Sequence, residues 1–215
     1  MEDIISNIQD RMELFKILSR FYCIPDTELI RVIREAADSK DSLISILADA
    51  IPETSPLEQL KIDYAALFLG PYGILAPPYG SAYFENEKSV MADSTLDAMK
   101  WYDDEGLDIA IKEAPDHIVV ELEFIYYLIF KQMQAINDSD HEGLVDYVMK
   151  QKAFMESHLG SWIPKFARQV GTNAGTDFYR ILAGFTESIV NREMFLLSTF
   201  KGGNDSSNET HYSAQ

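Results

Sequence analysis

The chain has 215 residues, which is enough for one domain with a substantial apolar core. Its 35 acidic residues against 18 basic ones leave a formal net charge of −17, which argues against nucleic acid or anionic membrane surfaces as main partners. A 47% share of hydrophobic residues excludes disorder of the whole chain, and the single cysteine, Cys23, excludes an intramolecular disulfide framework.

Apolar residues recur at helical spacing through most of the chain and predict an all-α fold, a bundle of about eight to ten helices. The predicted helices cover, in order, residues 4–22, 29–37, 42–50, 56–69, 94–105, 117–136, 142–160 and 177–200. Ser55-Pro56 and Ser139 have the pattern of helix starts, and Asp116 is expected to cap the helix that begins at residue 117.

We expect a single helical domain over residues 1–201, with halves 1–70 and 84–201 joined by an irregular loop, 70–83, rich in proline, glycine and tyrosine. Residues 202–215 are polar and predict a disordered tail. The loop and its flanks are uncharged, but their prolines and glycines predict no continuous membrane-spanning helix. A hinge in the loop would permit domain swapping, so a monomer and a domain-swapped dimer both stay open. The acidic N-terminus lacks a signal-peptide pattern, which favours the cytoplasm.

Residues capable of catalysis or metal binding show no recognisable spacing. The histidines at 117, 141, 158 and 211 do not pair at metal-ligand distances along a helix, and residues 70–73 lack the lysine of a phosphate-binding loop. We therefore expect no metal, no cofactor and no catalytic residue. One alternative is a helical nucleotide-hydrolysing enzyme that uses Asp116 and His117 as an acid–base pair, although a helix N-terminus favours a neutral imidazole. Another alternative is a general helical scaffold for protein assembly.

Two neighbouring segments differ from ordinary core patterns. The first runs from Tyr64 to Tyr83, where a helix end leads into the aromatic loop; it fits either a rigid linker on the core or a groove for an apolar peptide. The second runs from Asp93 to Glu123 and holds ten acidic and two basic residues, a net charge of −8. Such a run is usually a solvated face, yet it would attract a basic peptide.

At these residues the sequence resembles the TorD/DmsD-type redox-enzyme maturation chaperones, with the NarJ-type proteins as distant relatives. The resemblance depends on five motifs in chain order: Tyr64-x-x-Leu67-Phe68-x-Gly70-Pro71, Ala76-Pro77-Pro78-Tyr79-Gly80-Ser81-x-Tyr83, Ser89-Val90-x-x-Asp93-Ser94-Thr95-Leu96, Pro115-Asp116-His117 followed by Glu121-Leu122, and Phe178-Tyr179-Arg180-x-Leu182. Tyrosine stands at positions 64, 72, 79 and 83, where the members closest to DmsD favour tryptophan. That difference leaves the identity of the cognate peptide open.

The resemblance implies an all-helical chaperone without enzymatic activity. Such a chaperone binds the twin-arginine signal peptide and the apo form of a molybdenum-containing oxidoreductase, of the dimethyl sulfoxide or trimethylamine N-oxide reductase type. It holds this precursor until the cofactor is inserted and before export by the Tat pathway. The family's peptide-binding positions correspond to Tyr64, Leu67, Phe68, Pro77, Pro78, Tyr79, Asp116 and His117. From the same two segments we add Tyr72, Ser81, Tyr83, Glu121 and Glu123 as expected peptide-binding residues.

Overall fold

The computed structural model describes residues 2–37, 42–70, 73–84 and 93–200. Tyr72 and the predicted tail, residues 202–215, lie outside these ranges. Over the described residues the regular structure is helical, which confirms the predicted all-α class.

The order of the elements follows the predicted helices closely. They are α1 Glu2–Phe21, α2 Thr27–Ala37, α3 Ser42–Asp49, α4 Pro56–Tyr64, a π-helical turn Ala65–Leu69, a 3₁₀ turn Gly80–Tyr83, α5 Asp93–Asp104, α6 Ile118–Asn137, α7 His141–Ser157, α8 Leu159–Asn173 and α9 Asp177–Thr199. The helix α8 was not predicted, because Pro164 lies inside it and proline is a strong helix breaker in a sequence pattern. Its apolar face is nevertheless fully buried, which stabilises the helix in spite of Pro164.

Two predicted helix starts differ in detail from those in the structure. Ser55 has a left-handed backbone and makes no side-chain cap bond. The cap of α7 is Asp140, whose Oδ1 accepts from Gly143 N at 2.9 Å, so the predicted cap Ser139 precedes the true one by one residue. At α7 the Asp140 carboxylate thus satisfies the helix start.

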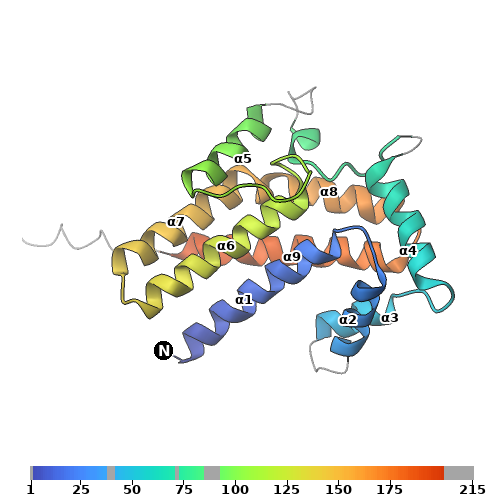
Figure 1. Cartoon of the computed structure of the whole chain (residues 1–215), viewed down its shortest axis with the longest axis horizontal. Helices are drawn as coiled ribbons and strands as arrows, with labels where there is room; N and C mark the ends of the chain where they lie inside the picture. Colours follow the sequence, from blue (N-terminus) through green and yellow to red (C-terminus); the bar gives the residue numbers. More distant parts are fainter. Residues whose placement is uncertain (1, 38–41, 71–72, 85–92, 201–215) are drawn as a thin grey trace, which may run out of the picture.

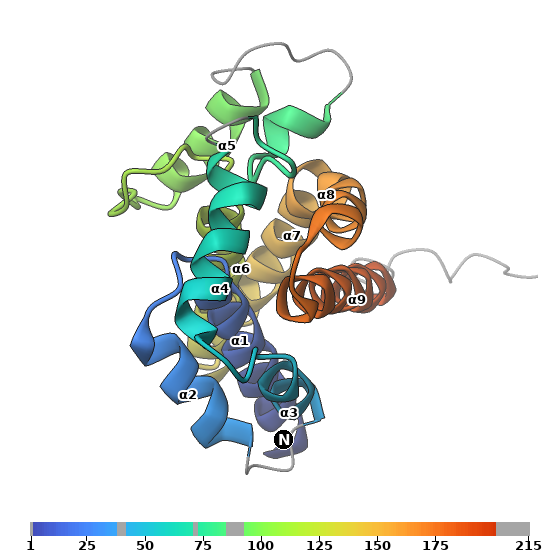
Figure 2. The ribbon, with the colours of Figure 1, turned by 90° about the vertical axis from the view of Figure 1, so that its right-hand side faces the viewer.

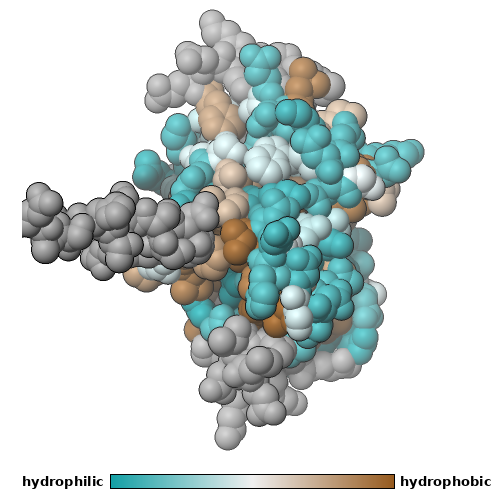
Figure 3. All heavy atoms as spheres, turned by 90° about the vertical axis from the view of Figure 1, so that its left-hand side faces the viewer, coloured by the Kyte–Doolittle hydropathy of each residue, from teal (hydrophilic) through white to brown (hydrophobic). Residues whose placement is uncertain are grey.

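The long helices lie side by side and form the body of the molecule (Figure 1). The central helix α6 packs against α1 and α7, and α8 pairs with α9. The shorter helices lie at the ends, with α2 and α3 at one end and α5 at the other (Figure 2). The end that carries the turn between α6 and α7 is mainly hydrophilic, with only scattered apolar side chains (Figure 3).

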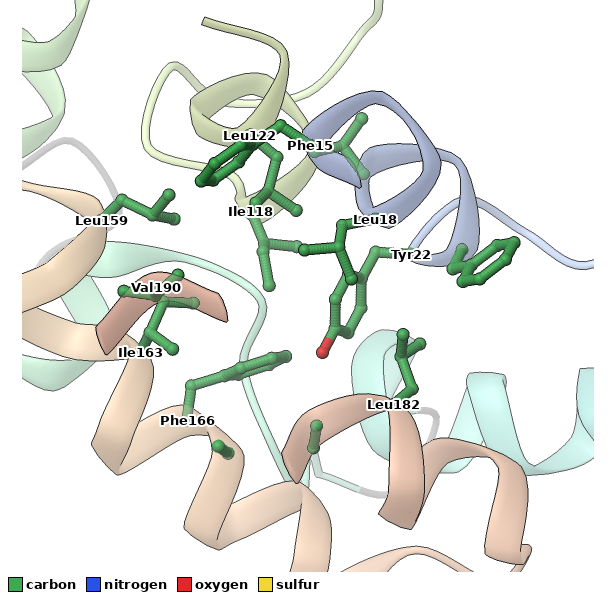
Figure 4. Packing of buried hydrophobic residues seen from close by; sticks show 14 of the residues in the cluster. Phe15, Leu18, Tyr22, Ile118, Leu122, Leu159, Ile163, Phe166, Leu182 and Val190 are labelled. Atoms are coloured by element: carbon green, nitrogen blue, oxygen red, sulfur yellow. The ribbon is translucent and has the colours of Figure 1, made fainter. Parts of the chain in front are cut away.

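Side chains from helices far apart in sequence meet in one contiguous core (Figure 4). Tyr22, in the turn that follows α1, Phe166 from α8 and Leu182 from α9 are fully or almost fully buried there. The Tyr22 hydroxyl shares a hydrogen bond of 2.9 Å with Thr186 Oγ1, so α9 supplies the partner of this buried tyrosine. Burial of large apolar side chains is the main stabilising term for such a bundle.

A buried polar network fixes the register of α1 against three other helices. Arg11 of α1 forms an ion pair with Glu193 of α9, which is 3% exposed. The same guanidinium donates to Gln151 Oε1 of α7 at 2.8 Å, and Gln151 in turn donates to Gln132 Oε1 of α6 at 3.0 Å. Because a buried charge needs such partners, this network specifies one arrangement of the four helices.

Candidate functional site at the start of α6

Residues 73–84, called the strap below, are held against the start of α6 by hydrogen bonds. Ile118 N donates to Pro78 O at 2.9 Å, and Gly80 N donates to Asp116 O at 2.9 Å. The Asp116 carboxylate, 1% exposed, accepts from Ser81 N through Oδ2 at 2.8 Å. A buried carboxylate that accepts a backbone N–H holds that backbone in place. Asp116, Ser81 and Pro78 therefore position the strap, and their direct contact with a peptide stays a prediction.

Gly80 lets the strap pass directly over the indole of Trp162. A Cβ at residue 80 would lie 3.0 Å from Trp162 Nε1. Tyr83 stacks on the same indole, with ring centroids 5.5 Å apart and an interplanar angle of 16°. The Tyr83 hydroxyl donates to Pro77 O at 2.8 Å. Because Tyr83 is buried, it anchors the strap and does not supply the exposed contact surface that the sequence suggested.

His117 is the N-cap of α6, the role predicted for Asp116. Its Nδ1 accepts from Val119 N at 3.2 Å. Burial lowers the pKa of His117 to about 4 and outweighs the opposing effect of the Asp116 charge, so the imidazole is neutral at neutral pH. Its ring meets Tyr79 edge to face at 5.1 Å, and its Nε2 lies 3.9 Å from Glu113 Oε2.

The sequence placed Glu121 in an acidic run of the kind that usually forms a solvated face. In the structure its side chain lies in the interior. Its Oε2 accepts from Trp162 Nε1 at 2.9 Å, while its Oε1 has no hydrogen-bond partner among the described residues and lies 3.9 Å from His158 Nδ1. Burial raises the pKa of Glu121 well above its ordinary value; the Trp162 hydrogen bond opposes this shift and the Asp116 charge adds to it. In the free protein this carboxyl group is therefore an interior acid, and its contact with a peptide stays a prediction.

The predicted aromatic face of the fourth helix is also part of the core. Tyr64, Leu67 and Phe68 are 6%, 0% and 3% exposed. Phe68 stacks on Phe166 at a centroid distance of 6.0 Å and meets Tyr179 edge to face at 5.6 Å. The spacing along the helix correctly places these side chains on one face, but that face packs against α8 and α9 and does not form an open groove.

Three of the predicted peptide-binding residues reach solvent. Pro77 and Tyr79 are half-buried on the strap, and Glu123 is exposed on α6. The Tyr79 hydroxyl donates to Glu113 Oε2 at 3.4 Å, which brings an acidic side chain beside the strap. Leu75, on the same strap, is 44% exposed, although the sequence analysis did not single it out. Its exposure depends on long-range packing, so no local pattern could have revealed it.

A groove of about 390 Å³, called the α1–α6 groove below, lies between α1, α6 and the segment 107–111. Most of its lining is apolar, including Ile109, Val120 and Phe124. Of the predicted site residues, only Glu123 lines it. In the sequence, apolar and polar residues alternate over part of 107–111, but so short and isolated a stretch does not predict a groove.

Part of the acidic run borders this groove. Asp108 and Glu123 line it, and Asp103 and Asp104 are exposed at the end of α5. Within the part of the chain that the structure describes, none of these four carboxylates forms an ion pair. Glu105 differs, because Lys150 Nζ lies 2.6 Å from its Oε1. The structure thus places unpaired acidic side chains beside an apolar surface.

A second groove, called the α2–α4 groove below, has a volume of about 750 Å³. Apolar side chains such as Ile30 and Leu57 line it, together with one acid, Glu58, and one base, Lys61. Across residues 2–37, 42–70, 73–84 and 93–200, no group of three or more potential ligands could hold a metal ion. In the same ranges no helix has the length and apolar character needed to cross a bilayer.

Comparison with known proteins relates this arrangement to one family. The family model of the nitrate reductase delta subunit matches residues 33–168. A Tat proofreading chaperone DmsD of Salmonella typhi is 29% identical over 135 residues, 62% of this chain and 59% of the relative, so the chain spans about three fifths of that protein. A chaperone protein TorD of Aliivibrio fischeri is 25% identical over 166 residues, 76% of each chain. A perchlorate reductase assembly chaperone protein of Dechloromonas aromatica is 29% identical over 137 residues, 61% of this chain and 60% of the relative.

A solved structure shows the same fold. The crystal structure of a redox enzyme maturation protein from Archaeoglobus fulgidus, described as putative, superposes with a TM-score of 0.54 at 26% sequence identity. The match covers 84% of this chain and 92% of the other. Because the family model matches more than half of the sequence, the chain belongs to the nitrate reductase delta subunit family, as a member of the TorD/DmsD type.

Proposed function

We propose that the protein is a cytoplasmic chaperone for the precursor of a molybdenum-containing oxidoreductase. It would bind the twin-arginine signal peptide and the apo form of the enzyme, and hold the precursor until the cofactor is inserted and before export. The observation that carries this proposal is family membership, because relatives matched over much of this chain are named TorD, DmsD and perchlorate reductase assembly chaperones.

The chemistry of the candidate site supports the same proposal. A twin-arginine signal peptide has two guanidinium groups followed by an apolar stretch, so its receptor needs carboxylates beside an apolar surface. Asp108 and Glu123 provide carboxylates at the rim of the α1–α6 groove. Each arginine–carboxylate contact contributes about 1 to 3 kcal/mol when partly desolvated. Burial of each leucine-sized side chain contributes about 1.5 to 3 kcal/mol, so the apolar stretch dominates affinity and the acids mainly speed encounter.

The predicted site residues divide into two groups under this proposal. Pro77, Tyr79 and Glu123 reach solvent and can contact a peptide directly. The buried members, such as Asp116 and Phe68, hold the strap and the core in place. Their substitution would weaken binding through loss of structure, and a stability measurement separates that effect from loss of a contact.

The geometry disfavours a nucleotide-hydrolysing enzyme built on Asp116 and His117. The Asp116 carboxylate accepts from Ser81 N, and His117 Nδ1 accepts from Val119 N. Both side chains are buried, so neither presents a free group to a bound phosphate. A general assembly scaffold stays as the second candidate, because one relative is named a perchlorate reductase assembly chaperone.

The experiment that tests the proposal is a fluorescence anisotropy titration with a labelled twin-arginine signal peptide. The control is a peptide of the same composition in scrambled order. We expect saturable binding of the signal peptide and binding of the control that is about tenfold weaker or more. Equal binding of both peptides, or of neither, would contradict the proposal. Binding of a folded mature oxidoreductase without any binding of the signal peptide would favour the assembly scaffold.

A further inference from the structure

The segment between α5 and α6 has backbone groups that the rest of the described chain leaves unpaired. The last backbone bond before it is from Leu107 N to Tyr102 O, and the next donor after it is His117 N, which bonds to Ala114 O. Among the described residues, no backbone partner accepts from the N–H groups of residues 108–113. Residues 107–110 lie between the turn at 105–106 and the bend at 111–113 and belong to no regular structure. Backbone groups without partners can pair with another chain that adds by main-chain hydrogen bonds.

The side chains of this segment alternate in exposure as those of an extended chain do. Leu107 and Ile109 are half-buried, whereas Asp108 and Ala110 are exposed. The half-buried side chains line the α1–α6 groove, which continues over Phe124 of α6. The volume of this groove, about 390 Å³, is within the range of about 300 to 1,000 Å³ typical of ligand-binding pockets. An unpaired backbone edge and an apolar groove therefore lie side by side.

The charges at the rim indicate what kind of segment would occupy the groove. Asp108 and Glu123 line it against one base, Lys16, which already lies 3.8 Å from Glu13. Partial burial raises the pKa of Glu123, as is expected of a carboxylate that lies beside apolar surface without a cation. The α2–α4 groove is larger, but its acid and base leave no net charge to select a cationic partner. Charge complementarity thus favours a cationic, apolar occupant in the α1–α6 groove.

We infer that the α1–α6 groove takes an extended apolar peptide segment with an arginine or lysine at its rim, and that this segment pairs its backbone with residues 108–110. The inference rests on the proposed function, because it names the place and the form in which the precursor's cationic and apolar segment would bind. Apolar side chains of the segment would lie in the groove and its cation beside Asp108 and Glu123. Recognition of the backbone would let one groove accept segments of different apolar sequence.

The test compares substitutions in the two grooves by anisotropy titration of the labelled twin-arginine signal peptide. Ile111→Asp puts a charge on a side chain that is 38% exposed in the α1–α6 groove, and Ala110→Pro removes one backbone donor. The matched control, Ile62→Asp, makes the same change in the α2–α4 groove, where Ile62 is 64% exposed. We expect Kd to rise about tenfold or more for each of the first two variants and to change less than about twofold for the control. Circular dichroism checks the fold of every variant, and Ile111→Asp alone decides the test if Ala110→Pro does not fold.

The failure of this inference is distinguishable from the failure of the proposed function. If both variants of the α1–α6 groove bind the signal peptide with the wild-type Kd, the inference is overturned and the proposed function stands. If the wild type binds no twin-arginine peptide, the proposed function fails, and a synthetic peptide of alternating leucine and alanine with one terminal arginine tests the groove independently. The inference predicts that this second peptide binds the wild type and loses affinity with Ile111→Asp; binding to neither, or to both equally, would refute it.

Discussion

Replacement of Glu121 by glutamine tests whether this carboxyl group is an interior acid or a peptide-binding charge. The side chain is 1% exposed, its Oε2 accepts from Trp162 Nε1, and its Oε1 lies 3.9 Å from His158 Nδ1. Because burial raises its pKa, the folded protein keeps the proton over a range of pH in which the unfolded chain has lost it. A glutamine has nearly the same shape and cannot ionise, so it removes this dependence on pH.

The sign and size of the effect follow from proton linkage. The folded state binds more protons than the unfolded state above the ordinary glutamate pKa of about 4.3, so the free energy of unfolding falls as pH rises. The fall reaches about 1.4 kcal/mol per pH unit and ends once pH exceeds the raised pKa of the folded state. The contribution of Glu121 to the free energy of unfolding is therefore fully present below the ordinary glutamate pKa. It is lost as pH rises through the raised pKa of the folded state. Glu121→Gln should lack this loss.

Urea unfolding between about pH 5 and pH 8 measures the difference. The control is Glu156→Gln, the same substitution at an exposed position of α7. The stability of Glu121→Gln relative to wild type should rise with pH by up to about 1.4 kcal/mol per unit, whereas the control should run parallel to wild type. A fixed cost of burying the amide shifts the curve without changing its slope. Parallel curves for all three proteins would refute the reasoning that Glu121 is a protonated interior acid.

Three further substitutions test the packing that positions the site. Asp63→Ala removes the acceptor of three hydrogen bonds, from Gly175 N, Thr176 N and Thr176 Oγ1. In urea unfolding it should lower the free energy of unfolding by about 3 to 5 kcal/mol. The exposed control, Asp177→Ala, should lower it by less than about 1 kcal/mol in the same series. Gly80→Ala places a Cβ 3.0 Å from an indole nitrogen and should lower the urea midpoint by an amount worth about 1 to 3 kcal/mol; an unchanged midpoint would show that the strap shifts freely. Phe68→Ala should cost about 3 to 5 kcal/mol in thermal or urea unfolding, and a cost near zero would mean that this ring is not a core residue.

The sequence predicted the helices well where a periodic apolar stripe met a clear stop. The first helix was expected over residues 4–22 and spans Glu2–Phe21. The helix expected over 94–105 ends at Asp104, shortly before Gly106, whose φ of 69° is left-handed. The helix α8 was missed because its internal proline conceals a stripe that tertiary packing stabilises. Gly160 lies near the start of that stripe, and a Cβ there would lie 2.5 Å from Met155 O. This constraint comes from packing, so the local spacing of residues does not indicate it.

The candidate site was harder to predict because its members are sorted by long-range contacts. Tyr64 and Phe68 do share a helix face, but only the structure shows that α8 and α9 cover it. Asp116 and Glu121 are acidic residues in an acidic run, yet one holds the strap and the other accepts from Trp162. Among the predicted carboxylates, only Glu123 lines a groove in the described structure. The opposite wall of that groove is the irregular segment 107–111, whose position no local sequence pattern indicates.

Hydrogen–deuterium exchange with and without a twin-arginine signal peptide tests the central claim most directly. The N–H groups of residues 108–113 lack backbone partners among the described residues, so they should exchange rapidly in the free protein. Addition of the peptide should slow exchange in this segment and leave the α2–α4 groove unchanged. If saturating peptide slows exchange elsewhere and leaves residues 108–113 unaffected, that result contradicts the claim that this acidic, apolar face receives the precursor.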